Sequence, residues 1–358
     1  MQDNLKKYFK NKKVIITGHT GFKGTWLTLW LINLGANIVG ISKDIHGSPS
    51  HYKDLKIEKK VRSYYFDIKD IKKLKKIFLK FKPDFVFHLA AQSMVKKSYS
   101  EPYETFLTNS LGSLNVLESL RVINKKCNLV MITSDKVYKN LEIKRGYHEN
   151  DELGGKDPYS ASKTAAETII KSYSDMMKNS KIKIAVARAG NVIGGGDWNK
   201  NRLIPDCVKA WGNNKKVFIR NPNSTRPWQN VLDVVRGYLI LAIKLNTSKN
   251  LNGEIFNFGP NKSENFSVIQ IVEHLKVNWK NVKWTIKSSK NNNIHESKLL
   301  KLNSNKSQKL LGWKCKMSLQ QSLKHTIEWY KNYYKKRKIN VFKISTDTLK
   351  KYQNLKRN

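Results

Sequence analysis

Short apolar runs alternate with segments of helical periodicity over the first half of the chain. Five such runs fit buried strands, and they lie at Val14–Ile16, Asn37–Ile41, Phe85–Leu89, Leu129–Ile132 and Ile182–Ala187. Apolar residues at helical spacing predict helices from the glycines after the first run to about Leu34, from Thr105 to Arg121 and from Ser160 to about Met177. Strands that alternate with helices are typical of a parallel sheet covered on both faces. We therefore predict an α/β fold with a doubly wound parallel sheet.

The pattern changes after Ala189, where glycines and prolines divide the chain into shorter pieces. This change predicts one domain at 1–189 and a smaller, loop-rich α/β lobe at 190–358. We expect part of 226–258 to return to the first domain. The lysine-rich tail after Trp329 is predicted to form a helix with a frayed end.

Composition narrows the class of protein. The 358 residues carry 68 Lys and Arg against 27 Asp and Glu, a net charge of +41. Because the lysines are spread along the whole chain, we expect solvated lysine-rich faces and no nucleic-acid partner. The three cysteines are far apart, which argues against a zinc site and for a reducing compartment. No apolar run approaches the roughly 18 residues of a membrane span, so we expect a soluble, cytoplasmic protein with no membrane partner.

Three glycines follow the first predicted strand at Gly18, Gly21 and Gly24. A strand, a glycine-rich turn and a helix form the Rossmann-type arrangement that binds the pyrophosphate of a dinucleotide. Asp44 lies 20 residues after Gly24 and is placed to bind an adenosine ribose, which favours NAD. Lys43 beside it could instead bind the 2′-phosphate of NADP. Asp67 is a second candidate near the adenine.

Tyr159 and Lys163 are four residues apart at the start of a predicted helix, so they share one face. A nearby ammonium favours the phenolate form of a tyrosine, which can then take a proton from a substrate hydroxyl. Ser134, Asp135 and Lys136 follow the fourth predicted strand. A hydroxyl, a carboxylate and an amine beside a redox pair indicate a further acid–base step.

Seven motifs together resemble the CDP-glucose 4,6-dehydratase family of the extended short-chain dehydrogenase/reductase superfamily. They are Gly18–Gly24, His88–Gln92, Ser98–Pro102, Thr133–Lys136, Asp157–Lys163, Ala189–Asp197 and Arg226–Gln229. The resemblance runs from Lys13 to about Tyr352. It implies a Rossmann-type domain, a small nucleotide-sugar lobe, bound NAD and a homodimer joined through helices 105–121 and 160–177.

The same resemblance implies a reaction and a set of site residues. CDP-D-glucose would be oxidised at carbon 4, lose water across carbons 5 and 6, and regain hydride at carbon 6. Ser134, Asp135, Lys136, Tyr159 and Lys163 would be the catalytic residues. The cofactor would contact Gly18, Thr20, Gly21, Phe22, Lys23, Gly24, Asp44, Asp67, Ile68, Leu89, Ala90, Ala91, Gln92, Asn109, Tyr159 and Lys163. The substrate would contact Gln92, Ser93, Ser134, Asn191, Arg202, Arg220, Arg226 and His295.

Several alternatives stay open at this stage. Asp135 could be the acid and Lys136 the base, or the reverse, because both assignments hold the same number of protons. The nucleotide could be dTDP, GDP or UDP. A 4-epimerase would use Ser134, Tyr159 and Lys163 without needing the Asp135–Lys136 pair. A non-catalytic relative that binds NAD or RNA is a further alternative from a different class.

Overall fold

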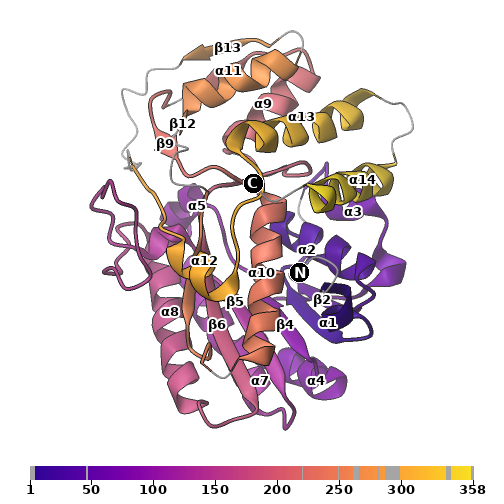
Figure 1. The fold of residues 1–358 in the computed structure, drawn as a ribbon, viewed down its shortest axis with the longest axis vertical. Helices are drawn as coiled ribbons and strands as arrows, with labels where there is room; N and C mark the ends of the chain where they lie inside the picture. The colour runs from indigo at the N-terminus through magenta and orange to yellow at the C-terminus, as the bar shows by residue number, and fades with distance from the viewer. Residues whose placement is uncertain are drawn as a thin grey trace.

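A seven-stranded parallel sheet forms the centre of the protein in this computed structural model (Figure 1). The structure describes residues 5–45, 47–219, 221–248, 250–260, 266–279, 282–286, 299–335 and 340–355. The strand order is β11-β6-β5-β4-β1-β2-β3. Their bounds are β1 Lys13–Thr17, β2 Asn37–Ser42, β3 Arg62–Tyr65, β4 Phe85–His88, β5 Cys127–Ile132, β6 Ile182–Ala189 and β11 Ile255–Phe258. The predicted α/β class and the five predicted strands are confirmed.

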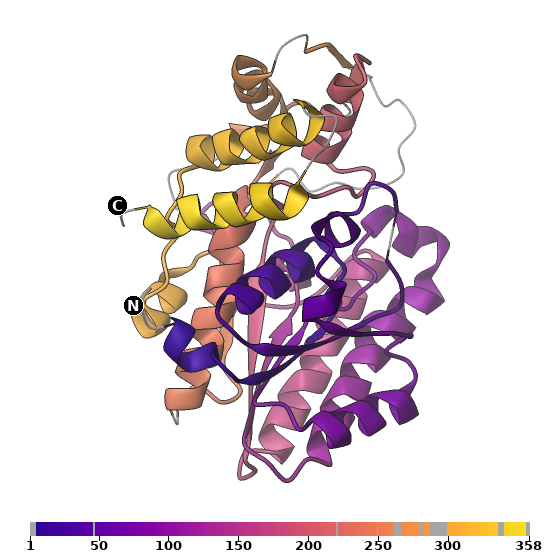
Figure 2. The same ribbon diagram turned by 90° about the vertical axis from the view of Figure 1, so that its right-hand side faces the viewer.

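Two layers of helices cover the sheet (Figure 2). On one face α2 (Phe22–Asn33) and α10 (Val231–Thr247) pack together, and α10 lies along β5 and β6. On the other face α4 (Ile71–Phe81), α7 (Gly112–Arg121) and α8 (Pro158–Met176) pack side by side. Each face has its own apolar cluster. The central strands β4 and β5 are buried throughout because both faces are covered, which explains their uninterrupted apolar sequences.

The helix predicted at Thr105–Arg121 is longer than expected and not uniform. It begins as α6 at Pro102–Phe106, passes through a π-helical turn, η3, at Leu107–Leu111, and continues as α7. Such turns insert one extra residue into a helix, which apolar spacing alone does not reveal. The remaining short helices of this half are α1 Leu5–Phe9, α3 His51–Leu55, η2 Glu58–Lys60, α5 Val95–Ser100 and η4 Asp135–Val137.

The second half of the chain contributes to both parts of the molecule. After α10, β11 joins the edge of the main sheet beside β6. Apart from α12, which packs against β11 and α10, the other elements lie beyond the carboxyl end of the sheet, towards the top of Figure 1. Their strands pair as β7 Val192–Ile193 with β10 Gln229–Asn230, β8 Val217–Ile219 with β13 Trp284–Ile286, and β9 Thr225–Arg226 with β12 Phe266–Ser267. Their helices are α9 Leu203–Gly212, α11 Val268–Asn278, α12 Asn305–Leu311, α13 Leu319–Lys335 and α14 Val341–Asn354. The division at residue 189 stays a prediction.

The C-terminal tail was predicted wrongly as one helix with a frayed end. It forms two helices, α13 and α14, which pack against each other (Figure 2). The Tyr352 hydroxyl on α14 donates to Asp233 Oδ1 at 2.7 Å. Lys316 Nζ donates to the carbonyl of Leu355 at 2.7 Å, just beyond the helix. Because the tail contains many lysines, its sequence did not reveal the apolar face through which α14 packs against the rest of the protein.

Within the described part of the chain, no helix has both the length and the apolar character needed to cross a membrane.

Candidate active site

The glycine turn between β1 and α2 is closed by backbone contacts that exclude side chains. Gly18 has φ +75°, and a Cβ there would lie 2.7 Å from the backbone nitrogen of Ala90. A Cβ on Gly24 would lie 2.0 Å from the carbonyl oxygen of Gly18. Helix α2 begins at Phe22, directly after Gly21. The turn therefore packs closely between β1 and the N-terminus of α2, an arrangement that suits the pyrophosphate of a dinucleotide.

The residues predicted near the adenosine lie after β2 and β3. The Thr20 hydroxyl donates to the carbonyl of Asp44 at 2.8 Å, which joins the glycine turn to the end of β2. Asp67 forms ion pairs with Lys43 at 3.3 Å and with Lys69 at 3.8 Å. Lys43, which sequence analysis considered for a 2′-phosphate, is thus beside a carboxylate that would compete with a phosphate. The predicted contact Ile68 is buried.

The loop after β4 is held by amide side chains. Asn109 Oδ1 accepts a hydrogen bond from the Gln92 backbone at 2.8 Å, and Asn109 Nδ2 donates to Ser162 on α8 at 2.9 Å. The Gln92 side chain bonds to the Met94 backbone in its own loop and to the Thr105 hydroxyl on α6. Both residues were predicted as ligand contacts, and the structure places them as supports of this loop. The other predicted contacts of the loop, Leu89, Ala90, Ala91 and Ser93, are half-buried or exposed.

The turn after β5 carries the three predicted acid–base residues. Ser134 and Asp135 are buried, whereas Lys136 is half-buried. The Ser134 hydroxyl donates to Asp135 Oδ1 at 3.1 Å and accepts from the Lys136 backbone at 3.2 Å. Asp135 Oδ2 has no hydrogen-bond partner among the described residues. Burial raises the pKa of Asp135, although the charges of Lys136, Lys23 and Arg226 oppose the rise.

The Tyr159–Lys163 pair lies in the first two turns of α8. The Asp157 side chain caps this helix by accepting from the Ser160 backbone at 2.9 Å, and Pro158 occupies its first position. Tyr159 is 8% exposed and Lys163 5%. Burial raises the pKa of Tyr159 to about 12, while interaction with the Ser134 hydroxyl lowers it. Burial and repulsion by Lys23 lower the pKa of Lys163 to about 7.

Two further cations face this group. Lys23 Nζ donates to the hydroxyl of buried Tyr238 at 3.4 Å, and burial and repulsion by Arg202 lower its pKa to about 8. Arg202 forms an ion pair with Asp197 at 3.0 Å, and its charge also acts on Tyr159. From the sequence, Lys23 was predicted only as a cofactor contact. Its effect on Asp135 and Lys163 comes from tertiary packing, which the glycine spacing does not reveal.

The loop that carries Arg226 lies against the turn after β5. A Cβ on Gly190 would lie 2.8 Å from Asp135 Oδ2 and 2.9 Å from Pro227 Cγ. The Asn191 carbonyl accepts from the Gln229 backbone at 3.1 Å, which fixes the loop beside it. Gly190 was not among the predicted site residues, because its close contacts are with residues 135 and 227, which are distant in the chain. The predicted residues Arg220 and His295 lie outside the described residues.

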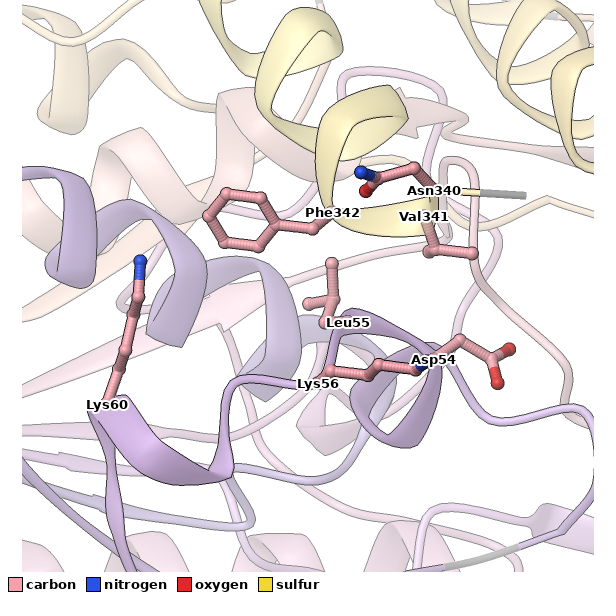
Figure 3. Close-up of a pocket in the computed structure, with 7 residues that line it drawn as sticks. All are labelled: Asp54, Leu55, Lys56, Lys60, Asn340, Val341 and Phe342. Atoms are coloured by element: carbon pink, nitrogen blue, oxygen red, sulfur yellow. The ribbon is translucent and has the colours of Figure 1, made fainter. Parts of the chain in front are cut away.

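A surface cavity of about 420 Å³ lies elsewhere, between the α3–η2 segment and the start of α14 (Figure 3). Two of the residues that line this cavity contact each other, since Lys60 Nζ lies 4.9 Å from the centre of the Phe342 ring. None of its lining residues belongs to the group around Ser134 and Tyr159.

Known proteins match this chain over most of its length. The family model for GDP-mannose 4,6 dehydratase matches residues 15–326. The CDP-glucose 4,6-dehydratase of Salmonella typhimurium is 40% identical over 333 residues, which is 91% of this chain and 92% of that protein. The structure of the epimerase Mth375 from Methanothermobacter thermautotrophicus has a TM-score of 0.82 at 25% identity, covering 93% of this chain and 96% of that one.

A more distant structure shares the fold. The dTDP-glucose 4,6-dehydratase of Bacillus anthracis, solved in complex with NAD, has a TM-score of 0.74 at 20% identity. It covers 89% of this chain and 96% of its own. The resemblance inferred from the seven motifs is confirmed. The chain belongs to the family of nucleotide-sugar dehydratases that the GDP-mannose 4,6 dehydratase model describes.

Proposed function

We propose that this protein is an NAD-dependent nucleotide-sugar 4,6-dehydratase that converts CDP-D-glucose to CDP-4-dehydro-6-deoxy-D-glucose and water. The observation that carries the proposal is the turn Ser134–Lys136, with its buried Ser134 and Asp135, beside Tyr159 and Lys163. It provides an acid–base pair in addition to the redox pair. The 40% identity to a CDP-glucose 4,6-dehydratase supports the choice of nucleotide. A product of this kind would supply deoxysugars for a surface polysaccharide.

The glycine turn fits a bound dinucleotide, because Gly18 and Gly24 pack too closely against backbone atoms to carry side chains of their own at the N-terminus of α2. Asp44 would hold the adenosine ribose, and Lys163 would hold a nicotinamide ribose hydroxyl. When bound, NAD supplies the hydride acceptor for carbon 4 of the sugar and the hydride donor for carbon 6.

The oxidation needs a base for the 4-hydroxyl proton, and Tyr159 Oη is that base in our proposal. Because the pKa of Lys163 is about 7, this residue can take up a proton near neutral pH. Its ammonium form then stabilises the phenolate of Tyr159. Ser134 Oγ would donate a hydrogen bond to the 4-oxygen of the sugar.

The elimination needs an acid for the 6-hydroxyl and a base for the hydrogen on carbon 5. In water, moving a proton from a lysine to an aspartate costs about 9 kcal/mol, because their pKa values differ by about 6.5 units. Burial raises the pKa of Asp135 and so reduces this difference. This favours Asp135 as the acid that protonates the leaving 6-hydroxyl and half-buried Lys136 as the base. After the proton leaves, Lys23, Lys136 and Arg226 stabilise the carboxylate.

Basic residues from the second half of the chain would hold the diphosphate of the substrate. Arg226 acts on Asp135 through its charge, and Arg202 acts on Tyr159. A guanidinium can donate two parallel hydrogen bonds to a phosphate. Asn191 precedes both arginines in sequence, and its carbonyl accepts from the Gln229 backbone beside the Arg226 loop. Arg220 and His295 stay predicted contacts.

Incubation of the purified protein with NAD and CDP-glucose tests the proposal. We expect the absorbance in strong alkali that marks a 4-keto-6-deoxy sugar, with slower turnover of dTDP-, GDP- and UDP-glucose in a competition panel. Tyr159→Phe should abolish turnover. Tyr173→Phe, on the same helix but bonded to Glu118, is the matched control and should retain it. A galactose-configured product without a keto sugar would instead show a 4-epimerase.

We infer in addition that the protein is a cytoplasmic homodimer. Exposed apolar side chains gather on α5, α6 and η3, at Tyr99, Tyr103, Phe106 and Leu111. These elements pack against α8, the second predicted interface helix. Sedimentation should show a dimer, and Leu111→Asp should give monomers, whereas Leu79→Asp on α4 should not. A monomeric wild type would contradict the dimer.

A further inference from the structure

A buried ion pair lies beneath the turn Ser134–Lys136. Arg188 on β6 is completely buried, and Glu167 on α8 is 3% exposed. Arg188 Nε donates to both oxygens of Glu167, at 2.9 and 3.1 Å, and its Nη2 donates to Oε2. Removing two charges from water is costly, so such a pair needs further hydrogen bonds to persist.

Those further bonds go to the two ends of the turn. Thr133, just before Ser134, donates its hydroxyl hydrogen to Glu167 Oε1 at 2.6 Å. Tyr138, two residues after Lys136, accepts from Arg188 Nη1 at 2.7 Å. One ion pair therefore fixes the chain on both sides of the predicted catalytic residues.

Three contacts fix Tyr138, at the C-terminal end of the turn. The Tyr138 hydroxyl donates to Asn257 Oδ1 on β11 at 2.8 Å. The Arg188 guanidinium lies 4.6 Å from the centre of the Tyr138 ring. The ring also stacks on Tyr147, with 4.9 Å between the ring centres. Because every contact is buried, little freedom remains for the turn at this end.

The same glutamate acts on Lys163, one helical turn earlier on α8. Its negative charge raises the pKa of Lys163, against burial and the positive charge of Lys23. His88 on β4 also faces Lys163, which helps to keep the imidazole neutral. Glu167 is thus the acidic group that favours the ammonium form of Lys163.

We propose that Glu167 and Arg188 are positioning residues for both halves of the reaction. The ion pair of Arg188 and Glu167 keeps the turn Ser134–Lys136 in position. Glu167 also stabilises the ammonium form of Lys163. This inference rests on the proposed function, since it assigns these residues to the same reaction. Neither residue touches the substrate in our proposal.

Mild variants separate positioning from folding. Thr133→Val and Tyr138→Phe each remove one hydroxyl and leave the ion pair intact. A misplacement of about 1 Å can cost about 10²-fold in rate, so we expect kcat to fall by about tenfold in each variant. The KM for the nucleotide sugar should stay within about twofold, because the Arg226 loop is unchanged. Thr168→Val, at an exposed position of α8, is the matched control and should leave both constants unchanged.

Glu167→Gln tests the electrostatic part. It removes the charge but keeps an oxygen for Thr133. The pKa of Lys163 should fall, so its ammonium form is lost at lower pH. The fall of kcat on the alkaline side of the pH profile should therefore begin at lower pH. Thr133→Val should show no such movement. Equal kcat in Thr133→Val, Tyr138→Phe and the wild type, together with an unchanged profile in Glu167→Gln, would overturn the inference.

Amide hydrogen exchange gives a readout that does not depend on turnover. Peptides covering 134–137 should exchange faster in Thr133→Val and Tyr138→Phe than in the wild type or in Thr168→Val. Unchanged exchange would count against positioning even if the wild type did not act on CDP-glucose. A wild type without turnover, but with faster exchange in the two variants, would contradict only the proposed function.

Discussion

Replacing Asp135 with asparagine isolates the elimination step. The side chain keeps its size, and the amide oxygen can still accept from Ser134 Oγ, as Oδ1 does at 3.1 Å. The amide nitrogen then occupies the position of Oδ2, which has no hydrogen-bond partner among the described residues. The variant therefore loses the transferable proton with little change in packing.

The magnitude follows from the role of a general acid. Loss of a positioned acid typically costs about 10²- to 10⁴-fold in rate, or about 3–5 kcal/mol in the barrier. In the proposed mechanism the oxidation at carbon 4 uses Ser134 and Tyr159 and not Asp135, so it should continue. Rapid mixing with CDP-glucose should thus show reduced nicotinamide accumulating, while the keto-deoxy product forms slowly. Product formation at the wild-type rate would refute the assignment of Asp135 as the acid.

The same variant should be more stable than the wild type at neutral and alkaline pH. The pKa of Asp135 is raised above its ordinary value of 3.8 in the folded protein, so folding favours the protonated carboxyl. Wild-type stability therefore falls as pH rises from that value through the folded pKa, and the cost is fully present above it. Asparagine does not titrate, so the gain in Tm should grow with pH through this window. A gain that does not vary with pH would show that the carboxyl is not held in its neutral form.

Three other substitutions test separate parts of the site. Lys136→Ala should still reduce bound NAD with substrate yet fail to eliminate water, and full dehydration in a product assay would remove Lys136 from the mechanism. Gly190→Ala places a Cβ 2.8 Å from Asp135 Oδ2, against an ordinary contact of at least 3.4 Å, so Asp135 must move by about 0.6 Å and kcat should fall by about tenfold. Gly154→Ala, whose Cβ would meet only ordinary contacts, should keep wild-type kcat as its control. Gly24→Ala would put a Cβ 2.0 Å from a backbone oxygen, and we expect calorimetry to show at least a tenfold loss of NAD affinity, with unchanged affinity contradicting the fit of the glycine turn.

The elements that sequence analysis found are those with local signals. The strand before Ser134 is an unbroken apolar run because both faces of the sheet are covered, and the glycine turn has a fixed spacing because backbone atoms touch there. The tail was predicted as one helix, and α14 was not recognised as a separate, docked helix because lysines that remain in solvent separate its apolar positions. Its docking depends on Asp233, more than a hundred residues earlier.

In the site, too, residues with a local sequence pattern could be predicted, and contacts between distant segments could not. Tyr159 and Lys163 could be read from a four-residue spacing, which places them together on any helix. The contact of Gly190 with Asp135 and the ion pair of Glu167 with Arg188 join separate elements. Glu167 and Arg188 lie outside all seven motifs, and no local pattern pairs Gly190 with Asp135. Only the packing of β5, β6 and α8 gives these residues a role.

Burial performs two tasks at once in this site. It raises the pKa of Asp135, so that a carboxylic acid can hold a proton, and it lowers the pKa of Lys163 to about 7, so that an amine can exchange one. The two shifts have opposite signs because burial disfavours whichever form is charged. Lys23 then acts in one direction on both groups, since its positive charge lowers the pKa of Asp135 and that of Lys163. At Lys163 the negative charge of Glu167 opposes the positive charge of Lys23. In the proposed mechanism, Glu167 thereby supports the ammonium form of Lys163 in the redox pair, within the same buried cluster as the elimination acid.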